Sequence, residues 1–406
     1  MKIALVAQHA TPAAGAGARQ ASATHADDTR LLELSRSLAN KGHRVTVYAG
    51  RHGASLPERA RLAPGVRIEY IGPADLADQR DDSGLLAQVP AFSHPLHERW
   101  RKDRPDVVHA LRWTSGLAAL AAVRDLGVPV VQSFDSLGVT ERRHRTTPLE
   151  AGTQRMRLEP AIGRSANAVL AGSSDEESDL TRLGVPRRSI KVVPCGVDTD
   201  EFTPEGPSCK RNDRHRLVTV TDLEEQDALG TLLRAMSKVP GAELVIAGGP
   251  PRDALSGNLA YRRLSRLTGS LDLSGRVFFA GQVGHADLPP LLRSADLLVN
   301  VSEYESSAVT SVQAMACGTP VIASAIGCQM DAVVDGTTGI LVPPGHAALL
   351  AQRIRQLLAH PMLLEAFGVA ATDRAQSRYS LDRIAHETLA VYDTALDSAA
   401  MAAMAA

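Results

Sequence analysis

Short apolar segments alternate with helical patterns along the first half of the chain. The first apolar segment covers residues 2–7, and leucines at helical spacing follow it until Gly42, a residue type that often ends helices. Because strands that alternate with helices build a parallel, doubly wound sheet, the pattern predicts an α/β domain over residues 1–202. Further strands are predicted at residues 45–49, 106–110, 128–134, 168–172 and 190–193, and helices at residues 117–126 and 175–183. We expect Ser173 or Ser174 to cap the last of these helices.

A polar stretch at residues 203–216, containing two prolines and a glycine, interrupts the alternation and is interpreted as an interdomain linker. A second α/β series over residues 217–379 then predicts a second domain of the same class. Its strands are expected at residues 217–220, 244–247, 277–280, 297–300, 321–323 and 339–342, and its helices at residues 228–236, 311–316, 347–359 and 363–377. We expect residues 380–396 to pack back onto the first domain and the Ala- and Met-rich residues 397–406 to be frayed.

The length and composition support two globular domains, and the net charge does not indicate a nucleic-acid or acidic-lipid partner. A chain of 406 residues is too long for one ordinary core. The formal net charge of -1 provides no field that would attract nucleic acid or acidic lipid. Four scattered cysteines predict neither a disulfide framework nor a zinc site and favour the reducing cytoplasm, and we expect no metal and no cofactor. No apolar stretch has the length of a membrane span.

Ligands of doubly wound sheets bind at the carboxyl ends of the strands, where helix N-termini favour anions. Two such domains in tandem therefore predict a cleft that accepts a phosphate-bearing ligand. The fold class alone does not identify that ligand.

Several motifs follow one another in an order that resembles glycosyltransferase family 4. The most specific are Pro-Cys-Gly-Val-Asp at residues 194–198 with Phe202 after it, and Ala-Met-Ala-Cys-Gly-Thr-Pro-Val-Ile-Ala-Ser at residues 314–324. The segments 106–110, 127–132 and 334–344 continue the resemblance. It implies the GT-B architecture, with two facing Rossmann-like, doubly wound domains and a central cleft. It also implies retaining transfer of a sugar from a nucleotide donor, with the acceptor on the first domain and the donor on the second.

The residues that would hold the donor diphosphate depart from the family pattern. In that family an Arg and a Lys bind the diphosphate, whereas Asp222 and Asp227 occupy these positions here, with Glu224 and Glu225 between them. Exchanging two cations for two anions beside a diphosphate costs several kcal/mol per contact at near-surface dielectric. After screening, we expect the donor affinity to fall by about a thousandfold.

Other donor positions are changed as well. The first glutamate of the family's Glu-x7-Glu element is retained as Glu305, a candidate catalytic residue, whereas the second, which binds ribose hydroxyls in the family, is Gln313. A family glycine is replaced by Ala308, whose Cβ we expect to crowd the donor. Val283, Val309 and Thr310 stand at positions that bind the donor in the family, and the resemblance therefore implies that they belong to the donor-binding set.

The first domain shows the same trend on the acceptor side. His109 is retained from the family's His-Ala-His motif, and Asp135 stands where the family has a histidine near the reacting sugar. Asp27 is one of the residues that replace the family's Gly-Gly loop. These positions place His109 and Asp27 on the acceptor side and make Asp135 a second candidate catalytic residue.

Retained packing motifs with altered donor positions favour a family-4-like paralogue that is impaired or inactive in standard nucleotide-sugar transfer. Such a pseudo-glycosyltransferase would scaffold or regulate an active enzyme, with weak nucleotide-sugar binding and a protein partner or a homodimer. The alternative is an active retaining transferase of a hexose, in which the acidic residues of 222–227 bind a divalent cation that bridges to phosphate. A Rossmann oxidoreductase is disfavoured because only Gly-x-Gly follows the first strand.

Overall fold

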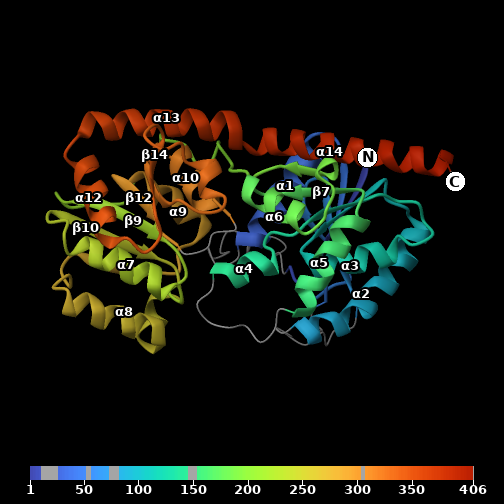
Figure 1. Ribbon diagram of the computed structural model, residues 1–406, viewed down its shortest axis with the longest axis horizontal. Helices are drawn as coiled ribbons and strands as arrows, with labels where there is room; N and C mark the ends of the chain where they lie inside the picture. Colours follow the sequence, from blue (N-terminus) through green and yellow to red (C-terminus); the bar gives the residue numbers. More distant parts are fainter. Residues whose placement is uncertain (11–25, 52–55, 73–81, 145–152, 303–306, 406) are drawn as a thin grey trace. The chain divides into compact units, whose positions relative to one another are not determined.

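The computed structural model describes residues 1–10, 26–51, 56–72, 82–144, 153–302 and 307–405 (Figure 1). The chain divides into two compact units. The first comprises Asp27–Pro194 together with the beginning of the chain and Asp382–Ala406, and the second contains Cys195–Leu381. Each unit is built around its own sheet.

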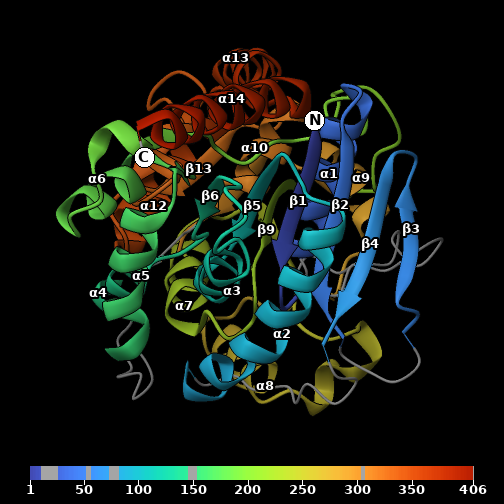
Figure 2. The same cartoon turned by 90° about the vertical axis from the view of Figure 1, so that its right-hand side faces the viewer.

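The sheet of the first unit has eight strands in the order β3-β4-β2-β1-β5-β6-β7-β8. All neighbouring strands are parallel except β3 and β4, which form an antiparallel pair at one edge (Figure 2). The sequence patterns did not predict these two strands, and the sheet is therefore not purely parallel. The strands are β1 (Lys2–Ala7), β2 (Arg44–Gly50), β3 (Arg59–Ala63), β4 (Val66–Ile71), β5 (Val107–Leu111), β6 (Val130–Ser133), β7 (Ala168–Ala171) and β8 (Ile190–Val192).

Helices cover both faces of this sheet. Ile3 and Leu5 of β1 pack in one buried cluster with α1 and α14, whereas Ala4 and Val6 pack in another with α2 and α3. Alternate residues of a strand point to opposite faces of the sheet. Helices therefore pack on both faces, as in a doubly wound sheet. The helices are α1 (Ala26–Asn40), α2 (Asp82–Lys102), α3 (Trp113–Ala122), α4 (Gly138–His144), α5 (Thr153–Ser165), α6 (Ser174–Arg182) and α14 (Leu381–Ala405), with the 3-10 turn η3 (Arg187–Ser189).

The sequence patterns missed α2 and α5 because prolines lie inside both helices, at Pro90, Pro95 and Pro160. Proline removes a helical hydrogen bond and usually indicates the end of a helix. The capping prediction for α6 is confirmed: the Glu176 N–H donates to the Ser173 hydroxyl at 3.1 Å.

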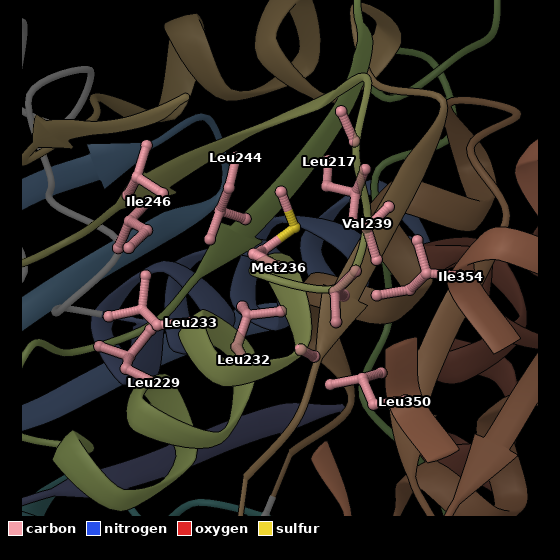
Figure 3. Packing of buried hydrophobic residues seen from close by; sticks show 14 of the residues in the cluster. Leu217, Leu229, Leu232, Leu233, Met236, Val239, Leu244, Ile246, Leu350 and Ile354 are labelled. Carbon is pink, nitrogen blue, oxygen red and sulfur yellow. The ribbon is translucent and has the colours of Figure 1, made fainter. Parts of the chain in front are cut away.

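The second unit contains a parallel sheet of six strands in the order β11-β10-β9-β12-β13-β14. Leu217, Leu244 and Ile246 of the strands face leucines of α7 and Leu350 and Ile354 of α12 in one large core cluster (Figure 3). The strands are β9 (His215–Val220), β10 (Ala242–Ala247), β11 (Val277–Gly281), β12 (Leu297–Asn300), β13 (Val321–Ser324) and β14 (Gly339–Val342). The helices are α7 (Gln226–Met236), η4 (Arg252–Gly257), α8 (Leu259–Ser270), η5 (His285–Asp287), α9 (Leu288–Arg293), α10 (Val309–Ala316), α11 (Gln329–Ala332), α12 (Ala347–Leu358) and α13 (Pro361–Tyr379).

The division between the units differs from the predicted boundary at residue 202. Cys195, Val197 and Phe202 pack into the core of the second unit. The Val197 N–H donates to the Tyr379 carbonyl at 2.8 Å, which joins this segment to the end of α13. The motif that resembled an interdomain signature is therefore already part of the second unit.

Residues 203–216, interpreted from the sequence as a linker, are bound along the second unit, and the last two belong to β9. The Arg293 guanidinium donates to the carbonyls of Thr203 and Pro207 at 3.0 and 2.8 Å. Arg211 forms an ion pair with Asp296 at 2.8 Å. Backbone carbonyls that are held by arginine in this way give the segment a fixed path despite its polar composition.

The last helix also differs from the prediction. Helix α14 belongs to the first unit but continues to Ala405, whereas the sequence patterns predicted fraying after residue 396. Alanine has the highest helix propensity, so a segment without an apolar period can still extend a helix. Within the described residues, no helix is both long and apolar enough to cross a membrane.

Candidate functional site

Three loops form one continuous rim at the carboxyl edge of the second unit's sheet. The loop after β9 is joined to β10 by the Thr221 N–H, which donates to the Ala247 carbonyl at 2.9 Å. The loop after β10 is joined to β11 in the same way, because the Gly248 N–H donates to the Gly281 carbonyl at 2.8 Å. The Gln282 N–H donates in turn to the Pro250 carbonyl at 3.0 Å. These bonds bring the predicted positions after β9 and β11 to one edge.

Two glycines fix the β9–α7 loop against β10. Gly248 and Gly249 have φ angles of 131° and 79°, which favour glycine. A Cβ on Gly248 would lie 1.9 Å from the Thr221 carbonyl oxygen, and a Cβ on Gly249 would lie 2.7 Å from the Leu223 side chain. Leu223 is buried in the core below. The sequence motifs do not include either glycine. Each glycine is required because a neighbouring segment of the chain approaches it closely, which the sequence does not show.

The acidic residues of this loop are displayed to solvent. Asp222, Glu224 and Asp227 are all exposed, and the Asp222 carboxylate accepts a 3.3 Å hydrogen bond from the Glu224 N–H. Asp227 lies in the first turn of α7, where the helix dipole stabilises a negative charge. The rim therefore presents carboxylates at the place where the resemblance predicts a donor diphosphate.

The four acidic side chains of the loop do not form a cation site. Throughout the part of the chain that the structure describes, no group of three or more His, Cys, Asp or Glu residues is arranged to hold a metal ion. The hypothesis that a divalent cation replaces the missing arginine and lysine is therefore not supported.

Helix α10 carries the positions that were predicted from the Glu-x7-Glu element. Ala308 is the N-cap of α10, and only 2% of its surface is exposed, because it packs in the buried cluster with Leu292 and Val312. The expectation that its Cβ crowds a donor is therefore wrong: the methyl group faces the core. Val309 and Thr310 lie in the first turn of α10 and are partly exposed, and Gln313 is buried one turn later.

Val283 follows β11 and packs partly buried against the same cluster that contains Ala308. The structure thus brings Val283 and the start of α10 to one core cluster, and their donor-binding role stays a prediction. Glu305 lies outside the described residues.

Sequence reasoning missed one cation at this rim. Arg263 of α8 donates a hydrogen bond to the Gln226 side-chain oxygen at 3.4 Å, and Gln226 is the first residue of α7. Arg263 therefore brings a guanidinium beside the start of α7, one residue from Asp227. No motif includes it, because α8 was not among the helices that the apolar pattern predicted.

In the first unit, the retained histidine is enclosed in the protein. His109 is 2% exposed, and its Nδ1 and Nε2 are hydrogen-bonded to the Tyr392 hydroxyl at 2.7 Å and the Ser133 hydroxyl at 2.9 Å. Burial lowers the pKa of His109 to about 4, while Asp135 acts in the opposite direction. The neutral His109 ring forms hydrogen bonds through both nitrogens inside the first unit, and it thereby connects β5 with β6 and α14. This geometry does not favour the acceptor contact that was predicted for His109.

Asp135 follows β6 and lies at the carboxyl edge of the first sheet, and its catalytic role stays a prediction. It has a φ angle of 62°, an uncommon value for a residue other than glycine. The Arg30 guanidinium of α1 lies 3.8 Å from its carboxylate. Asp27 lies in the first turn of α1, and its side chain is outside the described part of the structure.

Glu176 of α6 is a further acid at this edge, and none of the motifs in the sequence includes it. The Gly172 N–H donates to its Oε2 at 2.7 Å, and its buried Oε1 has no partner among the described residues. Burial raises the pKa of Glu176 to about 7; the hydrogen bond from Gly172 and the charge of Arg30 act to lower it, whereas the charge of Asp135 raises it further. Arg30, Asp135 and Glu176 thus form an electrostatically coupled group at the carboxyl ends of β6 and β7.

Family models match both halves of the chain. Residues 28–201 match the model described as Glycosyltransferase Family 4, and residues 206–374 match the model described as Glycosyl transferases group 1. The chain therefore belongs to the glycosyltransferases that these two models describe. The predicted α/β fold class, with two Rossmann-like domains of the GT-B glycosyltransferases, is confirmed.

Individual relatives cover nearly the whole chain. D-inositol 3-phosphate glycosyltransferase 2 of Catenulispora acidiphila is 30% identical over 98% of this chain and 95% of that protein. The structure is similar to sucrose-phosphate synthase from Thermosynechococcus elongatus, with a TM-score of 0.85, 26% identity and coverage of 97% of this chain and 98% of that chain. Anabaena HepE in complex with UDP-glucose shares the fold, with a TM-score of 0.70, 19% identity and coverage of 96% and 99%.

Proposed function

We propose that this protein is a family-4-like glycosyltransferase paralogue that is impaired in standard nucleotide-sugar transfer and acts as a scaffold or regulator of an active enzyme. The observation that supports this proposal is the acidic loop after β9. Asp222 lies on a loop whose Leu223 is buried in the core beside Gly249, and Asp227 lies in the first turn of α7, so both carboxylates are carried by backbone that is fixed at the carboxyl edge of the sheet. Their charge opposes binding of a diphosphate at the carboxyl edge of the sheet.

Transfer from a nucleotide sugar requires that the departing diphosphate be stabilised as its charge develops. Two solvated carboxylates increase that charge rather than compensate for it. Gln313 in place of the family's second glutamate adds a further loss, because an amide oxygen accepts a weaker hydrogen bond than a carboxylate. Together these changes support an impaired donor site on an otherwise intact framework.

The decisive experiment is a titration of the full-length protein with UDP-glucose, GDP-glucose and ADP-glucose, followed by calorimetry and by the shift in melting temperature. We expect no saturable binding by the wild-type protein at millimolar donor. The double variant Asp222→Arg/Asp227→Lys should gain affinity by about a thousandfold, the loss that we attribute to the two charges.

The matched control is Glu365→Arg/Asp373→Lys, which makes the same change in net charge on exposed positions of α13. It should gain no donor affinity. Tight donor binding by the wild-type protein, accompanied by sugar transfer, would contradict the proposal.

One observation favours a second candidate function, an active retaining transferase of a hexose. Arg263 brings a cation to the start of α7 and could serve a donor diphosphate in place of the lost lysine. The relatives are named as an inositol 3-phosphate glycosyltransferase and a sucrose-phosphate synthase, which supports a phosphorylated acceptor or product. This candidate requires that wild-type protein binds a nucleotide sugar and that Arg263→Ala abolishes the binding. Absence of donor binding by the wild-type protein excludes it.

A further inference from the structure

A groove of about 400 Å³ lies along β11, the strand at one edge of the second unit's sheet. Residues of η4, α8 and β11 line it, together with Ser274 from the connection between α8 and β11. Its volume lies within the range of small-ligand pockets. Its β11 residues belong to the strand itself, whereas the candidate donor rim follows the carboxyl ends of the strands. The groove adjoins the rim through η4, which follows Pro250 in the connection from β10 to α8, but extends away from it along α8 and β11.

Aromatic side chains form one part of the lining. The rings of Tyr261 and Phe279 meet edge to face, with centroids 5.0 Å apart, and both pack against the large core cluster. The neighbouring Phe278 is 45% exposed, which is unusual for a large apolar side chain. An exposed aromatic face carries partial negative charge and attracts the C–H groups on the apolar side of a sugar ring.

Hydroxyl groups form the other part of the lining. Ser256, Ser265 and Ser274 are exposed, and a hydroxyl can both donate and accept hydrogen bonds. Of the described residues that line the groove, Arg252 alone is charged. Its guanidinium provides several donors for neutral oxygen atoms.

The walls of the groove are held in place by bonds that need no ligand. The Tyr261 N–H donates to the Asn258 side-chain oxygen at 2.8 Å, which caps α8. The Arg262 guanidinium donates to the carbonyls of Ser256 and Gly257 at 3.0 Å each and fixes η4 against α8. A site formed in advance loses less entropy when a ligand binds.

We propose that this groove binds a neutral oligosaccharide. Aromatic faces for the C–H groups and hydroxyls for the sugar hydroxyls suit a saccharide. A purely apolar ligand would bury the serine hydroxyls without partners, which is costly. A nucleotide diphosphate would meet one arginine instead of the several cations that its charge requires. Because the groove contains neither the acidic residues 222–227 nor α10, the proposal goes beyond the proposed function and is tested independently of it.

The test is calorimetric titration of the full-length protein with maltotetraose, cellotetraose and mannotetraose. We expect saturable binding of at least one tetrasaccharide in the millimolar range. Phe278→Ser, which removes an exposed ring, should weaken it by about tenfold, the upper end of what an aromatic contact contributes. Ser265→Trp, which fills the groove from the exposed side of α8, should abolish it.

The matched control is Leu259→Ser, which removes a 66% exposed apolar side chain from the same helix but outside the groove. It should leave the affinity unchanged. The proposal is overturned if none of the three tetrasaccharides binds, or if Phe278→Ser and Leu259→Ser weaken binding equally. Phe278→Ser should leave the UDP-glucose affinity of the Asp222→Arg/Asp227→Lys variant unchanged, which separates this test from that of the proposed function.

Discussion

At the scale of single residues, His109 shows how a family position can be retained for packing. Its ring is buried between β5, β6 and α14, and its two nitrogens are bound to Ser133 and Tyr392. Such a residue connects the last helix of the chain to the first sheet. The motif around His109 does not indicate this role, because Tyr392 lies 283 residues away along the chain.

Removing the hydroxyl of Tyr392 tests this role. In Tyr392→Phe, the buried Nδ1 of His109 loses its partner, so we expect the free energy of unfolding to fall by about 1 to 3 kcal/mol. Urea denaturation at pH 7 measures the difference. Tyr261→Phe, whose hydroxyl belongs to a partly exposed side chain, is the control and should change stability by less than about 0.5 kcal/mol. Equal effects of the two variants would contradict the assignment.

Glu176 predicts a pH-dependent stability. Its pKa rises from 4.5 to about 7 on folding, so the folded protein retains a proton that the unfolded chain has released. The stability that protonated Glu176 contributes is therefore complete below about pH 4.5 and is lost as the pH rises to about 7. In Glu176→Gln, the amide oxygen can still accept from Gly172 but carries no charge. We expect this variant to be more stable than wild type at pH 8 by up to about 3 kcal/mol.

Denaturant unfolding of wild type and Glu176→Gln at pH 4.5, 6 and 8 measures the effect. At pH 4.5 the advantage of the variant should be largely gone. His109 acts in the opposite sense, because its folded pKa of about 4 makes stability fall as the pH drops from 6.5. Both proteins contain His109, so its contribution cancels in the difference. A difference that does not depend on pH would contradict the prediction, because it would show that the pKa of Glu176 does not change on folding.

At the scale of elements, the rim of the second unit depends on how closely β9 and β10 approach each other. Gly248→Ala would place a methyl group 1.9 Å from the Thr221 carbonyl oxygen, at a φ angle of 131°. We expect a loss of about 2 to 4 kcal/mol in the free energy of unfolding, from backbone strain and displacement of the loop.

Gly257→Ala is the matched control, since a Cβ there would have no heavy atom within 4 Å and its φ angle is ordinary. It should be neutral or slightly stabilising, because alanine restricts the unfolded chain. Thermal melts of both variants beside wild type give the comparison. A Gly248→Ala variant as stable as Gly257→Ala would show that the loop after β9 moves freely, which would also weaken the proposed function.

At the scale of the whole molecule, the end of the chain completes the first unit. Ala385, Val391 and Tyr392 of α14 lie in the buried cluster that covers one face of the first sheet. A chain that ends at Ser380 should therefore lose the cooperative folding of the first unit, while the second unit keeps its own core. Both tryptophans, Trp100 and Trp113, belong to the first unit, so tryptophan fluorescence reports on that unit alone.

We expect the truncated chain to show the red-shifted emission of exposed tryptophan in buffer and to retain a far-ultraviolet unfolding transition from the second unit. A chain that ends at Ser398 is the control. It removes only the end of α14, which includes the exposed Met401 and Met404, and should retain the native emission. Native emission from the chain that ends at Ser380 would refute the role of α14.

The sequence by itself determined the fold class, most strands and the family. Short apolar runs are read reliably because a strand buried on both faces must be apolar throughout. The edge pair β3 and β4 escaped because edge strands carry charged residues such as Arg59 and Arg61, and α2 and α5 escaped because they contain proline. The segments after β9 and β11 lie at one sheet edge, because the carboxyl ends of parallel strands share that edge, and their role in donor binding stays a prediction.

Only the tertiary structure decided what those positions contact. It placed the Ala308 methyl group in the core, bound both nitrogens of His109 inside the first unit and brought Arg263 beside α7. It also assembled the groove along β11 from η4, α8 and the strand. The physical reason is that burial and hydrogen bonding depend on neighbours that are distant along the chain. A motif specifies which residue stands at a position, whereas packing decides which way its side chain faces.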